Sequence, residues 1–141
     1  MASWQHQTLI EAPIRDVWEL VGDPQRYPEW ANDVVKVTGV PDVIQEGTRF
    51  ERVSKLPLGS TTTEFVVDEL TDLQEIRMRC LRSGYYSRWA LTEAGDDTFC
   101  EVEVGMEPTN APYKVLDRAV GKRWYRSAVT SMVDGLRKKL A

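Results

Sequence analysis

The most constraining feature of this sequence is the stretch EAPIRDVWELVGDPQRYPEW, which places three prolines and two tryptophans within residues 11–30. Proline lacks the N–H that a sheet ladder needs, but it suits the first turn of a helix. Pro13 therefore ends a strand over residues 4–11 and begins a helix whose apolar side chains recur with helical spacing. Asp23 can cap a second helix that starts at Pro24. We expect two short helices in a sharp V rather than a linker.

The chain from residue 33 to residue 106 changes to the alternating pattern of strands. Segments rich in β-branched and aromatic residues are separated by turns that contain glycine, aspartate or proline, which predicts six further strands. Their hairpin-like succession favours an antiparallel sheet. Residues 113–140 then repeat apolar side chains every four positions, which predicts one long helix. The expected fold is α+β, with residues 1–141 as a single domain.

Composition excludes several functional classes. The net charge of −4 and the pI of about 5.1 argue against a nucleic-acid partner. No apolar run approaches the length of a membrane span, and the start MASWQHQTL lacks the basic region of a secretory signal. The two cysteines suit a reduced, cytoplasmic location, and the single histidine and the absence of a clustered ligand motif predict no metal and no cofactor.

Strand alternation predicts which side chains face the interior. The inward faces combine apolar residues with a polar set: His6, Thr48, Arg52, Ser54, Thr61, Thr63, Tyr85 and Ser87. A dry core would leave several of these groups without partners, at a cost of about 1–3 kcal/mol each. We therefore expect a cavity that holds a ligand. The candidate ligand-binding residues are His6, Phe50, Arg52, Thr63, Phe65, Met78, Tyr85, Trp89, Val102, Val104, Leu116 and Val120.

The stretch IEAPIRDVWELVGDPQRYPEW and the order of elements resemble the START-related, polyketide cyclase/dehydrase and lipid-transfer superfamily (SRPBCC). The resemblance implies the helix-grip fold, in which a seven-stranded curved antiparallel sheet, with two short helices after strand 1, wraps a long C-terminal helix around a deep cavity. It also places Leu56, Leu58 and Tyr113 at the cavity mouth. In the family's strand order Cys80 and Cys100 are separated by a third strand, about 9–10 Å apart and beyond disulfide reach.

Three functional hypotheses follow. The first is binding of a small hydrophobic or amphipathic ligand, lipid- or polyketide-like, by a monomer or homodimer. The second, implied by the resemblance, is a polyketide cyclase/dehydrase of the aromatase/cyclase type, in which Arg52, Tyr85 and Ser87 orient a ketone-rich substrate. The third is a quinone- or lipid-chaperoning role at a membrane surface, against which the acidic net charge argues.

Two of the candidate residues allow a second interpretation. The guanidinium of Arg52 can bind a ligand's carboxylate or carbonyl, or it can pair with an inward acid such as Glu64 or Glu69. His6 can act as a proton shuttle, because its ordinary pKa lies near neutrality, or it can be a hydrogen-bonded histidine near a strand start.

Overall fold

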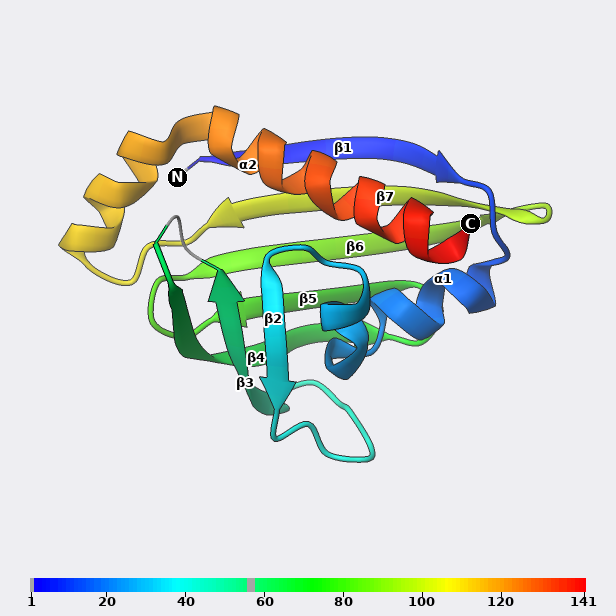
Figure 1. Cartoon of the computed structure of the whole chain (residues 1–141), viewed down its shortest axis with the longest axis horizontal. Helices are drawn as coiled ribbons and strands as arrows, with labels where there is room; N and C mark the ends of the chain where they lie inside the picture. The colour runs from blue at the N-terminus through cyan, green and yellow to red at the C-terminus, as the bar shows by residue number, and fades with distance from the viewer. Residues whose placement is uncertain (1, 56–57) are drawn as a thin grey trace.

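The computed structural model describes residues 2–55 and 58–141. Its elements are β1 (Ser3–Ile10), α1 (Ile14–Val21), η1 (Pro24–Glu29), β2 (Val34–Thr38), β3 (Arg49–Lys55), β4 (Ser60–Thr71), β5 (Glu75–Cys80), β6 (Tyr85–Ala94), β7 (Asp97–Met106) and α2 (Ala111–Leu140). Over the described residues, seven strands form one antiparallel sheet in the order β1-β7-β6-β5-β4-β3-β2. The helix α2 crosses one face of this sheet (Figure 1). The helices α1 and η1 lie at the end of the sheet that the C-terminal part of α2 reaches. The predicted helix-grip fold is confirmed.

The V of two short helices forms where the prolines predict it. The helix α1 begins directly after Pro13, and Asp23 caps η1 by accepting a hydrogen bond from the Gln25 N–H at 3.0 Å. One detail differs from the prediction, because η1 is a 3₁₀ helix that continues through Pro28 to Glu29. Proline's fixed φ is compatible with such a turn, and only its own N–H bond is lost.

The tryptophan at the end of the V has a structural role. The Trp30 ring lies edge-on to the Trp89 ring with 5.6 Å between centroids, and its Nε1 donates to the Leu20 carbonyl at 3.2 Å. The helix α2 approaches this point so closely that a Cβ on Gly135 would lie 2.0 Å from the Trp30 carbonyl oxygen. The interior is therefore filled at the end of the sheet that α1 and η1 cover.

The helix α2 is not the single straight helix that the sequence predicts. It begins at Ala111, and Gly121 interrupts it with φ 62° and ψ −172°, a conformation that favours glycine. The buried Asp117 carboxylate spans the break, because its Oδ1 accepts a hydrogen bond from the Tyr125 hydroxyl at 2.6 Å. It also accepts from the backbone N–H of Ala2 at 3.0 Å. The segment before Gly121 bends away from the rest of the helix (Figure 1).

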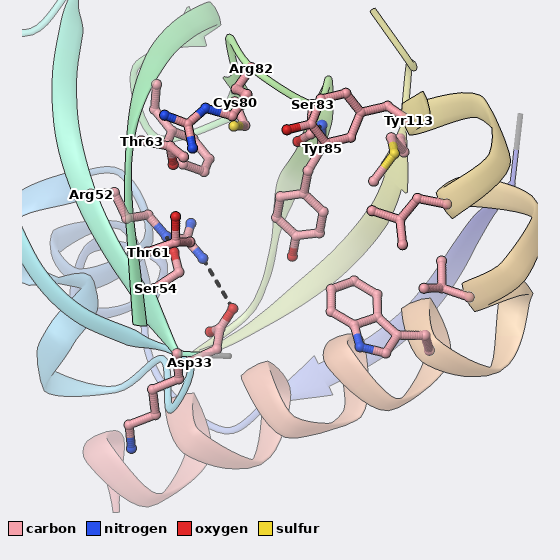
Figure 2. Close-up of a pocket in the computed structure, with 16 residues that line it drawn as sticks. Asp33, Arg52, Ser54, Thr61, Thr63, Cys80, Arg82, Ser83, Tyr85 and Tyr113 are labelled. Carbon is pink, nitrogen blue, oxygen red and sulfur yellow. Dashed lines mark hydrogen bonds and ion pairs between the residues drawn. The ribbon is translucent and has the colours of Figure 1, made fainter. Parts of the chain in front are cut away.

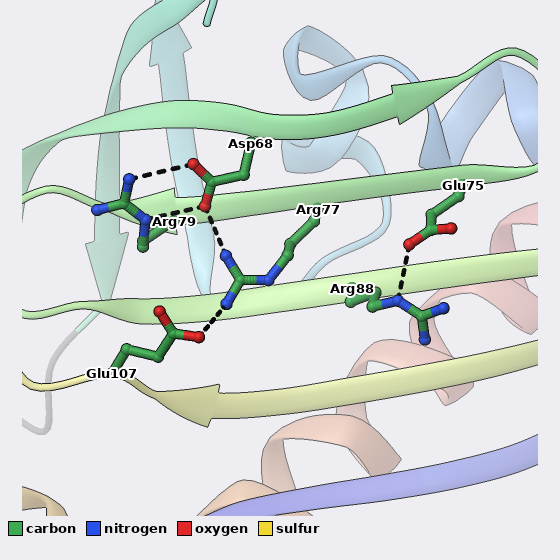
Figure 3. Close-up of polar contacts among 6 residues, drawn as sticks. All are labelled: Asp68, Glu75, Arg77, Arg79, Arg88 and Glu107. Atoms are coloured by element: carbon green, nitrogen blue, oxygen red, sulfur yellow. Dashed lines mark hydrogen bonds and ion pairs between the residues drawn. The ribbon is translucent and has the colours of Figure 1, made fainter. Parts of the chain in front are cut away.

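The face of the sheet opposite α2 carries arginines whose charges are neutralised locally. Arg77 and Arg79 both bind Asp68, at 2.6 and 2.8 Å, and Arg77 also contacts Glu107 at 2.6 Å. Figure 3 shows this network together with Arg88 and Glu75, whose side chains are 2.8 Å apart. Arg88 also contacts Glu101 at 3.1 Å. Each of these three arginines is therefore neutralised by a carboxylate on or next to the sheet.

Candidate ligand-binding site

A cavity of about 500 Å³ lies between the sheet and the first half of α2 (Figure 2). The described residues that line it are Asp33, Arg52, Ser54, Lys55, Thr61, Thr63, Phe65, Cys80, Arg82, Ser83, Tyr85, Met106, Tyr113, Leu116, Val120 and Trp124. Its size falls within the range of about 300–1,000 Å³ that is usual for small-molecule sites. Apolar side chains from the sheet and α2 form much of the wall, and a few polar groups interrupt it.

Arg52 is the charged group buried deepest in this wall. It projects from the inward face of β3 and is only 4% exposed. Its Nε donates to Ser54 Oγ at 3.0 Å, its Nη2 donates to Asp33 Oδ2 at 3.0 Å, and its Cζ lies 4.8 Å from the centroid of the Phe65 ring. A guanidinium has five N–H groups, so these contacts leave donors that can bind a ligand oxygen.

The acid that pairs with Arg52 differs from the prediction. Glu64 and Glu69 were the examples of an inward acid that the sequence suggests, but the partner is Asp33, which lies just before β2. Alternation places Glu64 on the outer face of β4, where it lies 3.5 Å from Arg49. The Asp33 side chain is 41% exposed, so the pair joins the buried guanidinium to the solvent-facing edge of the cavity.

Tyr85 supplies a neutral hydrogen-bond donor to the same cavity. It projects from β6, and its ring lies edge-on to the Trp124 ring with 5.8 Å between centroids. Burial is the main cause that raises the pKa of Tyr85 above its usual range, the negative charge of Asp33 adds to the rise, and Arg52 opposes it. The phenol is therefore protonated at neutral pH and can donate its O–H to a carbonyl or hydroxyl oxygen.

A second polar corner surrounds the Cys80 thiol at the end of β5. Burial raises the pKa of Cys80, but hydrogen bonds from the side chains of Ser83 and Thr63 and from nearby backbone groups outweigh it, so the pKa is lowered. Burial raises the pKa of Cys100 to about 12. Both cysteines are free, and β6 separates their strands, as the sequence predicted.

The structure brings together about half of the predicted site residues. The ones that line the cavity are Arg52, Thr63, Phe65, Tyr85, Leu116 and Val120. The others on the inward face are packed in the core instead: Phe50, Met78, Ser87, Trp89, Val102 and Val104. They face inward as predicted, but alternation identifies only the face and not how far along it the space stays open. Of the three proposed catalytic residues, Ser87 is therefore outside the cavity lining.

The placement of His6 is a correction. Its backbone pairs with Val102, so it is on the predicted face, but β1 is the edge strand and the side chain is exposed to solvent. It does not line the cavity. Of the expected mouth residues, Tyr113 lines the cavity and Leu58 is 92% exposed, whereas Leu56 lies outside the described residues.

Several lining residues were missed by sequence reasoning. Cys80 and Met106 stand on inward faces, and Trp124 belongs to the apolar stripe of α2, so the pattern contained a signal for these three. Asp33 and Arg82 lie outside the strands, where no periodicity applies. Their contribution depends on how the chain ends come together in three dimensions.

Neither a metal centre nor a membrane span is found among the described residues. In residues 2–55 and 58–141, no group of three or more His, Cys, Asp or Glu side chains is placed to hold a metal ion. No helix in that part of the chain is both long enough and apolar enough to cross a membrane.

A curved antiparallel sheet that holds a long helix over such a cavity defines a helix-grip protein. All of residues 1–141 match the family model described as "Polyketide cyclase / dehydrase and lipid transport". The chain belongs to this family, which confirms the superfamily that the sequence resembles. A comparison with curated proteins gave no match.

Solved structures share the fold at low sequence identity. The di-domain ARO/CYC BexL from the BE-7585A biosynthetic pathway superimposes with a TM-score of 0.73 at 17% identity, covering 99% of this chain and 46% of that one. This chain thus spans about half the length of BexL. A START superfamily protein from Mycobacterium smegmatis gives 0.70 at 14% identity, covering 99% and 94%. The Zhui aromatase/cyclase from Streptomyces sp. R1128 gives 0.63 at 16% identity, covering 97% and 87%.

Proposed function

We propose that this protein binds a small amphipathic ligand, lipid- or polyketide-like, in the cavity under the first half of α2. The observation that carries this proposal is the placement of Arg52, which is 4% exposed and stands in a largely apolar wall. Burying a charged group is costly unless it is paired and hydrogen-bonded. The ion pair with Asp33 stabilises the guanidinium in the cavity wall, and the remaining N–H donors of Arg52 can bind an oxygen of the ligand.

The charge balance favours a neutral polar group on the ligand. Asp33 already compensates Arg52, so a ligand carboxylate there would lie near a second carboxylate, and like charges repel. A carbonyl or hydroxyl oxygen can accept from both Arg52 and the protonated Tyr85 without this penalty. The apolar body of such a ligand would then contact Leu116 and Val120 on α2.

Uptake of the neutral fluorescent probe N-phenylnaphthylamine tests the proposal. Val120→Trp adds a large ring to the cavity wall, whereas Val115→Trp makes the same change in the same helical segment at a side chain that is 67% exposed and does not line the cavity. We expect wild type and Val115→Trp to take up the probe and Val120→Trp to lose most of its affinity. The absence of uptake by wild type, or equal uptake by the two variants, would contradict the proposal.

A second candidate function is cyclisation and dehydration of a ketone-rich substrate. The specific observation in its favour is that Arg52 and Tyr85 both face the cavity, where two donors can polarise a reacting carbonyl. In such a reaction an enolate carbon attacks a ketone carbon, the new alkoxide takes a proton, and loss of water follows. The relatives with aromatase/cyclase in their names support the chemistry only by likeness of fold.

Turnover of a synthetic poly-β-ketone thioester separates the two functions. If the protein is a cyclase, Arg52→Gln and Tyr85→Phe should each lower the rate of ring formation while probe affinity changes little. If wild type does not accelerate ring formation over the uncatalysed reaction, or if neither variant lowers the wild-type rate, the cavity is a binding site only. We further propose that residues 1–141 act as one cytoplasmic domain, monomeric or homodimeric, without a nucleic acid or a cofactor.

A further inference from the structure

The cavity mouth is locally basic although the chain carries a net charge of −4. Residues 111–126 of α2 contain five cationic side chains: Lys114, Arg118, Lys122, Arg123 and Arg126. The same segment has one acid, Asp117, which is buried and hydrogen-bonded to Tyr125 and the backbone of Ala2. Lys55 and Arg82 in the cavity lining add two more cations. The acidic total therefore hides a basic region at one end of the molecule.

Unlike the arginines of the sheet, these cations have no acidic partner among the described residues. Within residues 2–55 and 58–141, no ion pair involves the mouth cations, namely Lys55, Arg82, Lys114, Arg118 and Lys122. By contrast, Arg77, Arg79 and Arg88 on the outer face all bind carboxylates (Figure 3). A cluster of unpaired like charges is available to an external anion.

Exposed apolar side chains lie among the mouth cations. Leu58, in the turn between β3 and β4, is 92% exposed, and Val115 beside Lys114 is 67% exposed. Leu116 and Trp124, which line the cavity, also keep nearly half of their surface exposed. We call the mouth surface the set of Lys55, Leu58, Arg82, Lys114, Val115, Leu116, Arg118, Lys122 and Trp124.

We propose that the mouth surface docks on an anionic lipid bilayer. A soluble phosphate or carboxylate would use the cations but would leave Leu58 and Val115 in water. A bilayer uses both components, because its headgroups attract the cations while apolar side chains and tryptophan enter the interfacial layer. This rests on the proposed function in one respect, since the amphipathic ligand would pass between the lipid and the cavity through the docked mouth.

The expected size of the electrostatic contribution follows from the number of cations. A basic residue near an anionic membrane contributes about 1 kcal/mol, which is roughly fivefold in the partition coefficient. Lys114 and Arg118 are exposed and one helical turn apart, so they face the same side of the first segment of α2. Their joint neutralisation in Lys114→Gln/Arg118→Gln should weaken binding to anionic vesicles about 25-fold.

Vesicle flotation with the full chain tests the proposal. The vesicles are phosphatidylcholine alone or phosphatidylcholine mixed with phosphatidylglycerol, at low and at high salt. The matched control is Arg15→Gln/Lys36→Gln, which removes one arginine and one lysine from exposed positions on α1 and β2 that lack ion pairs with described residues. A third variant, Leu58→Ser/Val115→Ser, removes apolar surface without changing charge.

We expect wild type and the control to bind the anionic vesicles, more weakly at high salt, and not to bind vesicles of phosphatidylcholine alone. The two mouth variants should both bind more weakly, while N-phenylnaphthylamine uptake in the absence of vesicles stays at the wild-type level. No preference of wild type for anionic vesicles, or equal loss in the control and the lysine–arginine variant, would overturn the proposal. Binding of monomeric short-chain phosphatidylglycerol without vesicle binding would also overturn it, in favour of a free ligand. If wild type takes up no N-phenylnaphthylamine, that result would instead contradict the proposed function.

Discussion

Replacing Asp33 by asparagine should reveal how much the ion pair between Asp33 and Arg52 contributes to the free energy of unfolding. The substitution keeps the shape of the side chain and one carbonyl oxygen but removes the charge that compensates Arg52, whose Nη2 lies 3.0 Å from Asp33 Oδ2. Removing one partner of a fully buried pair costs about 3–5 kcal/mol, whereas an exposed pair contributes about 0–1 kcal/mol. With Arg52 4% exposed and the Asp33 side chain 41% exposed, solvent screens the pair in part, and we expect a loss of about 2 kcal/mol.

Urea unfolding of wild type and Asp33→Asn measures this difference in the free energy of unfolding, with one slope m fitted to both proteins. For a chain of this size, about 2 kcal/mol corresponds to a melting temperature roughly 6 °C lower. Asp42→Asn is the matched control, because Asp42 is exposed in the connection between β2 and β3 and forms no ion pair with a described residue, so its effect should stay within about 0.5 kcal/mol. The double variant Asp33→Asn/Arg52→Met should be less destabilised than Asp33→Asn alone, because it leaves no uncompensated charge.

The same variant has a consequence for ligand choice. Without the Asp33 carboxylate, the repulsion that disfavours an anionic ligand beside Arg52 disappears. Asp33→Asn should therefore bind a fatty carboxylate about tenfold more tightly relative to the neutral probe. A stability change no larger than that of Asp42→Asn, together with unchanged carboxylate affinity, would refute the reasoning that Asp33 is the main counter-charge of Arg52.

Three further predictions concern packing, thiol chemistry and pH. Gly135→Ala should destabilise the protein by about 3 kcal/mol in urea unfolding, because the new methyl group would lie 2.0 Å from the Trp30 carbonyl oxygen. Iodoacetamide should alkylate Cys80 faster than Cys100, because the pKa of Cys80 is lowered whereas burial raises the pKa of Cys100 to about 12. N-phenylnaphthylamine should slow the alkylation of Cys80, because this thiol lines the cavity. Hydrogen bonds with a neighbouring arginine and lysine hold the pKa of Glu29 at about 2 rather than 4.5, so its contribution is present above about pH 4.5 and is lost as the pH falls towards 2. The stability difference between wild type and Glu29→Gln, below about 1 kcal/mol for this exposed group, should shrink across that window and in high salt.

The fold could be predicted from local patterns because the residues that end a strand or begin a helix act through local chemistry. Pro13 ends a strand for lack of an N–H, and Asp23 caps the next helix through its own side chain. The break at Gly121 could not be predicted in the same way, since the apolar repeat continues across it. Glycine permits the conformation, but the tertiary contacts of Asp117 with Tyr125 and with the start of the chain select it.

The site could be predicted only in part, because strand alternation specifies a face and not a depth. Phe65 and Trp89 both face inward, yet the first lines the cavity and the second is packed against Trp30. His6 has the correct face but stands on the edge strand, beyond the cover of the helix. The net charge does not reveal the basic mouth for a related reason, since a sum over the chain does not show that residues 111–126 contain five cations and a single acid, which is buried.

The division between a filled and an open end explains why the cavity is where it is. After Gly121, α2 lies close to the sheet. Gly135 has no side chain, so the Trp30 carbonyl can approach the helix, and Val129 and Met132 pack in the core. The segment before Gly121 runs in a different direction, so Leu116 and Val120 line the cavity on the side opposite the sheet. The volume open to a ligand is thus set by backbone features that do not touch it. Related chains that share Arg52 and Tyr85 but differ around Gly121 should therefore hold ligands of different size with the same polar group.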